Sequence, residues 1–395
     1  MFSDKMKSIL TLLFGLFTFM VSAQQIRLSP QAKISVITCG PGDELYAAFG
    51  HNAFRVEDRS LAIDQAYNYG TFDFNTPDFY TKFARGKLLY QLSSYPFHYF
   101  LREYIQDNRW VKEEVLDLSD EEKQAFFDFL QNNAKPENRS YLYDFFFDNC
   151  ATKLPEVAHK ILGDSIQLNY DFARDKAYTF RDLLHMYLVK KPWEKFGIDL
   201  ALGAVIDRKA TPQEYLFLPD YVDKAFEKGA LNTNPLVSET KMLFASTETT
   251  AKSSLLSPIN IFALLAIAVL LITFRDHTRH KRSKWLDLLV FIITGITGLV
   301  ILFLWFATDH TATAKNYNAL WAFAPNLLLA FAVLKDKLPS WFRYYLLTLL
   351  FLLLLTVVLW VLNVQVFPLA IIPILLFLAV RYGYLYKAGY KKHSL

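Results

Sequence analysis

The sequence predicts an α+β domain outside the membrane, followed by an all-α membrane domain. Of the 395 residues, 53% are hydrophobic, but the apolar surplus is concentrated in the first two dozen residues and after about Ser257. The segment between these ends combines alternating, β-branched stretches with helix-sized pieces. A short cluster of strands with helices gathered around it is typical of an α+β domain.

The N-terminus has the features of a secretory signal peptide, predicted over residues 1–23. Lys5 and Lys7 form a basic region, "ILTLLFGLFTFM" is the apolar core, and "VSA" ending at Ala23 matches a cleavage site. The alternative is a permanent membrane anchor. In either case the domain that follows, residues 24–243, is expected to be exported.

The C-terminal part, residues 258–395, carries five apolar runs, each close to the ~20 residues that cross a bilayer core. They cover about residues 258–274, 285–306, 317–334, 341–362 and 365–385. Basic segments such as "RDHTRHKRSK" follow the first, third and fifth runs, and positive loops remain in the cytoplasm. We therefore expect five transmembrane helices, an exported domain, a cytoplasmic C-terminus and a tether over residues 244–257.

The net charge of +4 reflects these cytoplasmic loops and does not indicate a nucleic-acid partner. We also find no glycine-rich phosphate loop and predict neither a cofactor nor a metal.

Within the exported domain, the strand-like stretches are "AKISVITCG", "AFGHNAFRVED", "QAYNYGTFDF" and "KLLYQLSSY". A helix is expected to begin at Thr76 with Pro77 in its first position. A second helix is expected after Ser119, where Glu122 completes the spacing of a capping box.

The domain contains two cysteines, Cys39 and Cys150. A disulfide between them is one hypothesis, since exported proteins permit disulfides. The other is that Cys150 is a nucleophile, because Asp148 and Asn149 are strong N-cap residue types that would place the thiol in the first turn of a helix, where its pKa is lowered. Pro155 is expected to kink that helix or delay its start.

A thiol nucleophile needs a base, usually a histidine held by a third polar group. The exported domain offers His51, His98, His159 and His185. His51 has a strand-like context in "AFGHNAFRV", with Gly50 beside it leaving room for close approach. For each of these histidines an ordinary surface or core role is the alternative.

The stretches "TCGPGDELYAAFGHNAFRV", "YNYGTFDF" and "YLYDFFFDNCATK", together with the membrane part and its "TDHTATAKNYNALWAFAPN" loop, resemble the Lnb family of lipoprotein N-acyltransferases of Bacteroides-type bacteria. The order of the histidine strand, the next strand and the cysteine helix is also similar to the circularly permuted, papain-like NlpC group. The resemblance implies a papain-like permuted fold, with Cys150 as nucleophile and His51 as base. Asn68 is the candidate orienting residue, with Tyr67 and Tyr69 as alternatives.

The same resemblance implies the reaction. Cys150 would take a fatty acyl chain from a membrane phospholipid as a thioester and pass it to the N-terminal amine of a diacylglyceryl-cysteine lipoprotein. The phospholipid donor, the diacylated lipoprotein acceptor and the bilayer are the expected partners. The resemblance also implies the bacterial inner (cytoplasmic) membrane, with the exported domain on the periplasmic side. Asn52, Arg55 and Asn149, within the matching motifs, are candidate substrate-binding residues.

The outer loop after the second run adds four more candidates, which would bind a headgroup or the lipoprotein N-terminus: Asp309, His310, Asn316 and Asn318. A solvated loop is the alternative, just as the aromatic stretches "LSSYPFHYFLREY" and "YLYDFFF" could form an acyl groove or be ordinary core. Two other functions remain open: a membrane-tethered papain-like hydrolase, and a non-enzymatic platform stabilised by a Cys39–Cys150 disulfide.

Overall fold

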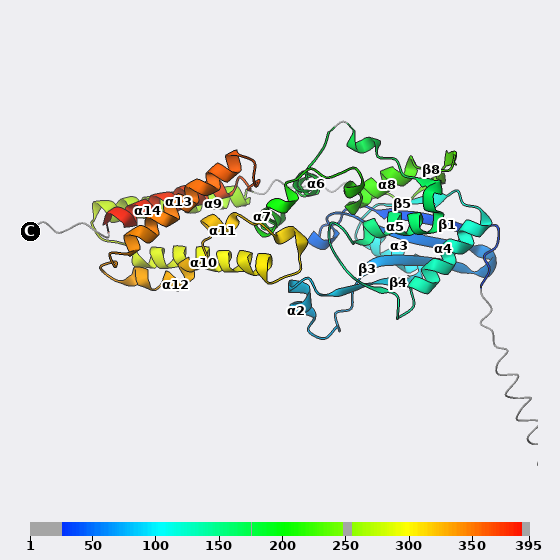
Figure 1. Ribbon diagram of the computed structural model, residues 1–395, viewed down its shortest axis with the longest axis horizontal. Coiled ribbons are helices and arrows are strands. Elements are labelled where there is room, and N and C mark those ends of the chain that lie inside the picture. Colours follow the sequence, from blue (N-terminus) through cyan, green and yellow to red (C-terminus); the bar gives the residue numbers. More distant parts are fainter. Residues whose placement is uncertain (1–25, 175, 248–254, 389–395) are drawn as a thin grey trace, which may run out of the picture.

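The computed structural model describes residues 26–174, 176–247 and 255–388. The predicted signal peptide and half of the predicted tether lie outside these residues. An N-terminal α+β domain is followed by a helical domain, and the two lie end to end along the long axis of the molecule (Figure 1). This confirms the predicted order of the two domain types.

A seven-stranded antiparallel sheet organises the N-terminal domain, in the order β10-β5-β1-β2-β3-β4-β6. Its strands are β1 (Lys33–Cys39), β2 (His51–Asp58), β3 (Ile63–Thr71), β4 (Leu89–Pro96), β5 (Val111–Leu116), β6 (Ser140–Leu142) and β10 (Val237–Phe244). The four stretches predicted as strands are β1 to β4. The last residues of the predicted exported domain, together with Phe244 of the predicted tether, form β10, an edge strand of this sheet.

Helices cover both faces of the sheet. The helices of this domain are α2 (Phe79–Ala84), α3 (Phe97–Gln106), α4 (Asp120–Asn133), α5 (Cys150–Leu162), α6 (Phe180–Tyr187), α7 (Pro192–Ala201) and α8 (Pro219–Glu227). A small second sheet joins β7 (Ile166–Gln167), β8 (Ala230–Leu231) and β9 (Asn234–Pro235). Side chains alternate between the two faces of a strand, so each face of the large sheet can form a core. Helices α4, α5 and α8 pack on one face, and α3 packs on the other.

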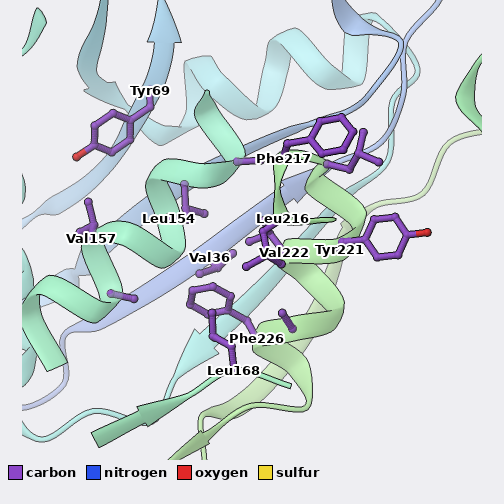
Figure 2. Close-up of a cluster of buried hydrophobic side chains, with 14 of the residues drawn as sticks. Val36, Tyr69, Leu154, Val157, Leu168, Leu216, Phe217, Tyr221, Val222 and Phe226 are labelled. Atoms are coloured by element: carbon purple, nitrogen blue, oxygen red, sulfur yellow. The ribbon is translucent and has the colours of Figure 1, made fainter. Parts of the chain in front are cut away.

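The larger core lies between the sheet and the pair α5–α8. Figure 2 shows Leu154 and Val157 of α5, together with Val222 and Phe226 of α8, gathered around Val36 of β1. All five side chains are buried. This packing fixes the direction of α5, whose first residue is Cys150.

Two local expectations differ from the structure. The helix predicted to begin at Thr76 is α2, which begins at Phe79, because Asp78 takes a left-handed conformation (φ 58°) that cannot continue a helix. The helix with Pro155 begins at Cys150 without delay, since the capping box of Asn149 and Thr152 holds its first turn. The capping box predicted at Ser119 is confirmed at the start of α4.

The helical domain contains α9 (Pro258–Thr278), α10 (Lys284–Phe306), α11 (Asn318–Trp321), α12 (Pro325–Leu329), α13 (Phe342–Val361) and α14 (Ile371–Ala388). Within the described residues, three helices are long and apolar enough to cross a membrane: α9, α10 and α13. Length and composition therefore support three of the five predicted transmembrane helices, and the other two stay a prediction.

The predicted third run, residues 317–334, is broken into short helices. Pro325, which lacks an N–H, occupies the first position of α12. The broken segment packs so closely on α10 that a Cβ on Gly298 would lie 1.9 Å from the carbonyl oxygen of Ala322. The predicted fifth run contains α14, where Arg381 is fully buried and paired with Asp276 and Asp287.

Candidate active site

Cys150 is the first residue of α5, and Asn149 is its N-cap. The Asn149 Oδ1 atom accepts hydrogen bonds from the backbone N–H groups of Ala151 and Thr152, at 2.8 and 2.9 Å. The Asn149 Nδ2 atom donates to the carbonyl oxygens of Phe145 and Phe217, both at 2.8 Å. This buried residue therefore locks the thiol into the N-terminal turn, where the helix dipole favours a negative charge.

The sheet opens at the point where α5 begins. The pairing of β2 with β3 runs from Asp58–Ile63 to Phe54–Tyr67, and the strands then part. Cys150 fits at this opening: a Cβ on Gly70 of β3 would lie 3.3 Å from the Cβ of Cys150. The positive φ of Gly70 (85°) and this close contact both favour glycine at the position.

His51 begins β2 beside this opening and is oriented by Asn68 of β3. The distance from His51 Nε2 to Asn68 Oδ1 is 2.6 Å, and Asn68 Nδ2 donates to the hydroxyl of Tyr95 at 2.9 Å. Because Asn68 Oδ1 only accepts, His51 Nε2 carries the proton, and Nδ1 is left for the thiol. The ring of Tyr104 stacks on the imidazole at 6.3 Å between centroids.

The two alternative orienting residues point to the other face of the sheet. The hydroxyl of Tyr67 accepts a hydrogen bond from Gln131, and that of Tyr69 donates to Asn133. Asn68 is thus the one of the three that contacts His51.

The electrostatics favour a thiolate–imidazolium pair. Burial by itself would raise the pKa of the Cys150 thiol, but the charge and hydrogen bond of His51 lower it below its ordinary value, helped by the backbone N–H groups of Asn52 and Ala151. Burial by itself would lower the pKa of His51, but the Cys150 thiolate and the hydrogen bond to Asn68 raise it. Each partner therefore stabilises the charged form of the other.

The thiol pKa of Cys39 is shifted in the direction opposite to that of Cys150. It is fully buried in β1, and burial raises the pKa of its thiol well above the ordinary value. Both cysteines are free, which overturns the hypothesis of a platform stabilised by a disulfide.

Two of the predicted substrate-binding residues have their polar groups used inside the domain. Arg55 forms ion pairs with Asp64 at 2.7 Å and Glu113 at 3.0 Å. The side chain of Asn52 is buried and donates to Thr38 Oγ1 at 2.8 Å, so its contribution to the site is its backbone N–H. Asn149, the third, acts as the cap described above.

The four candidates in the outer loop fall into two groups. Asn316 and Asn318 are fully buried, and their side-chain amides donate to the carbonyl oxygens of Leu200 and Asp199 in α7. They therefore join the helical domain to the N-terminal domain, and this placement does not support a role in substrate binding. Asp309 and His310 lie against residues 85–87, where the Asp309 N–H donates to the Arg85 carbonyl at 2.9 Å.

The sequence did not point to the part played by Tyr95 and Tyr104, which complete the surroundings of His51. Tyr95 lies in β4 opposite Ala66 of β3, and Tyr104 lies in α3. Both belong to the aromatic stretch that the sequence suggested as an acyl groove. Only the strand register brings Tyr95 to Asn68, so no local signal could have identified it.

The fold and the site together define a membrane protein whose outer α+β domain carries a Cys–His–Asn arrangement. A family model described as the Lnb N-terminal periplasmic domain matches residues 22–185, and one described as the Lnb transmembrane domain matches residues 250–393. The chain belongs to the Lnb family, and its N-terminal domain is periplasmic. No curated protein and no solved structure matches the chain.

Proposed function

We propose that this protein is a lipoprotein N-acyltransferase that uses Cys150 as an acyl carrier. The observation that carries the proposal is the Cys150–His51 pair at the start of α5, with a lowered thiol pKa and a raised imidazole pKa. Membership of the Lnb family and attachment to a membrane domain support lipid-anchored substrates. The permuted papain-like relationship stays a prediction.

The first half-reaction acylates the enzyme. The Cys150 thiolate attacks the ester carbonyl of a phospholipid. The backbone N–H of Cys150 stabilises the oxyanion, since those of Ala151 and Thr152 donate to Asn149. The C–O bond then breaks, the leaving alkoxide takes the proton of the His51 imidazolium, and a lysophospholipid departs. The acyl chain remains on Cys150 as a thioester.

The second half-reaction transfers the chain. The α-amine of a diacylglyceryl-cysteine attacks the thioester, and His51 accepts the proton that the amine loses. The C–S bond breaks, an amide forms, and the thiolate–imidazolium pair is restored. Asn68 keeps the imidazole in one tautomer through both steps.

The membrane orientation is part of the proposal. The basic segments of the helical domain favour a cytoplasmic C-terminus in the inner membrane. In the structure Arg282, within the first basic segment, donates to the carbonyl of Lys335, within the second. The two segments therefore lie on the same side of the helical domain, as a shared cytoplasmic location requires.

Mass spectrometry of lipoprotein N-terminal peptides tests the proposal in cells whose sole N-acylating enzyme is this protein. Wild type is expected to give a triacylated cysteine, and Cys150→Ala and His51→Ala to leave the amine free. A triacylated product from Cys150→Ala would exclude the thioester mechanism. Absence of N-acylation in wild type would instead favour a membrane-tethered hydrolase.

A further inference from the structure

An arm of residues 72–88 connects β3 to β4 and exposes an unusual number of aromatic rings. Phe74 is 69% exposed, Tyr80 is 80% exposed and Phe83 is 53% exposed. Their rings cluster with that of Phe79, with centroids 4.9 to 6.3 Å apart. Exposed apolar clusters of this kind mark interaction sites.

The position of the arm relative to the membrane domain is fixed by contacts. The backbone N–H of Asp309, three residues after α10 ends at Phe306, donates to the carbonyl of Arg85, and the Asp309 carboxylate lies 3.7 Å from the Lys87 ammonium. A Cβ on Gly86 would lie 3.2 Å from His310. In Figure 1 α2 projects from the sheet to lie beside the end of α10, a candidate membrane span.

The charge of the arm is divided along its length. Asp73 and Asp78 lie in its first part, whereas Lys82, Arg85 and Lys87 lie in the part that contacts the loop after α10. Within the described part of the chain, the side chains of Lys82 and Arg85 form no ion pair. Basic side chains at the end of a membrane span are suited to phosphate headgroups.

The arm also leads directly to the active site. It starts two residues after Gly70, which packs against Cys150. Just beyond its other end, Tyr90 of β4 stacks on Tyr143 at 4.2 Å. Burial raises the pKa of Tyr143, and the charge of the nearby Cys150 thiolate raises it further. Since Phe72 also contacts Tyr90 at 5.3 Å, the rings of the arm are in continuous contact with Tyr143.

We propose that the arm is a membrane-surface anchor: its aromatic rings enter the outer face of the bilayer, and Lys82 and Arg85 bind the phosphates of phospholipids. Aromatic side chains favour this interface because the ring is apolar and its edge or hydroxyl is polar. Resting on the proposed function, the anchor would present the ester of a bound phospholipid to Cys150.

Photocrosslinking tests the anchor in the full chain reconstituted in vesicles that contain an alkyne-tagged phospholipid. Benzoylphenylalanine is placed at Tyr80, at Phe83, and at Leu61 as the control. Leu61 is 43% exposed but follows β2 at the end of the sheet opposite His51. We expect at least fivefold more lipid labelling at positions 80 and 83; labelling equal to that at position 61 would overturn the proposal.

Charge reversal tests the headgroup contact. In vesicles of phosphatidylethanolamine and phosphatidylglycerol, Lys82→Glu with Arg85→Glu is expected to reduce labelling from position 80 by about fivefold for each basic side chain lost. Arg59→Glu, at the far end of the sheet, is the control and should leave it unchanged. An equal loss in both variants would overturn the headgroup contact.

The labelling does not depend on acyl transfer, so it can be repeated in Cys150→Ala. Labelled lipid without any N-acylation by wild type would keep the anchor and reject the proposed function. N-acylation by wild type without labelling of the arm would reject the anchor and keep the proposed function.

Discussion

At the scale of single residues, the reactivity of Cys150 depends on His51. Burial opposes ionisation of the thiol, and the neighbouring imidazolium reverses that effect. The sulfur is therefore a thiolate at a pH where Cys39, whose burial outweighs the opposing charge of Arg109, is still a thiol.

This difference predicts the alkylation of the two thiols. At pH 7 iodoacetamide should modify Cys150 and leave Cys39 unmodified in the folded protein, as measured by peptide mass spectrometry. His51→Ala removes the charge that lowers the thiol pKa, so the pH profile of alkylation should move upward, with about a tenfold slower rate at pH 7 for each pKa unit. His98→Ala, an exposed histidine of α3, should behave as wild type. Equal rates in wild type and His51→Ala would contradict the pairing.

At the scale of elements, the site depends on two features meeting: the capped start of α5 and the parting of β2 from β3. The core between α5, α8 and the sheet fixes the position of α5 over the sheet, and Asn149 fixes the conformation of the first turn of α5. Loss of the cap should therefore affect both stability and chemistry.

Asn149→Ala is expected to lower the free energy of unfolding of the domain by about 2 to 3 kcal/mol, because it removes the cap and leaves one buried and one partly buried carbonyl without this donor. Ser119→Ala removes the exposed cap of α4 and should cost about 1 kcal/mol. Thermal unfolding of the two variants measures this difference. In addition, Asn149→Ala should slow alkylation of Cys150 at pH 7, whereas an identical slowing in Ser119→Ala would argue against the cap as the cause.

At the scale of the whole molecule, the periplasmic domain is docked on the membrane domain by polar contacts. Arg181 pairs with Asp199 at 2.8 Å and with Asp207 at 2.6 Å, and Asp207 also accepts from the Val366 N–H at 3.2 Å. The N–H of Gly203 donates to the carbonyl of Ala312 in the outer loop. We call the contacts of Asp207 and Gly203 with the membrane domain the joint. The joint holds the active site at a fixed position relative to the membrane spans.

Gly203→Ala tests the joint, because the added Cβ would lie 1.9 Å from the carbonyl oxygen of Ala314. We expect N-acylation of lipoproteins to fall at least tenfold, while iodoacetamide still modifies Cys150 at the wild-type rate. Gly197→Ala in α7 is the matched control, since its Cβ would meet no atom within 4 Å. Full N-acylation by Gly203→Ala would show that fixed docking is not required.

Sequence patterns predicted what depends on local chemistry. β-branched alternation located β1 to β4, Ser119 and Glu122 located the start of α4, and Asn149 located the start of α5. Pro155 misled because its effect on a helix depends on how firmly the preceding turn is capped. The run over residues 317–334 misled because hydropathy does not report breaks in a helix, which here follow from Pro325 and from close packing on Gly295 and Gly298 of α10.

By itself, the sequence determined the division into an outer α+β domain and a helical membrane domain, and it named Cys150, His51 and Asn68 as candidates. It could do so because hydropathy, capping and residue chemistry are properties of short stretches. Tertiary structure alone decided that Asn68 rather than Tyr67 or Tyr69 faces His51, that Asn316 and Asn318 are buried at the joint, and that the aromatic arm lies at the end of α10. These outcomes depend on strand register and domain docking, which arise from contacts between residues far apart in the chain.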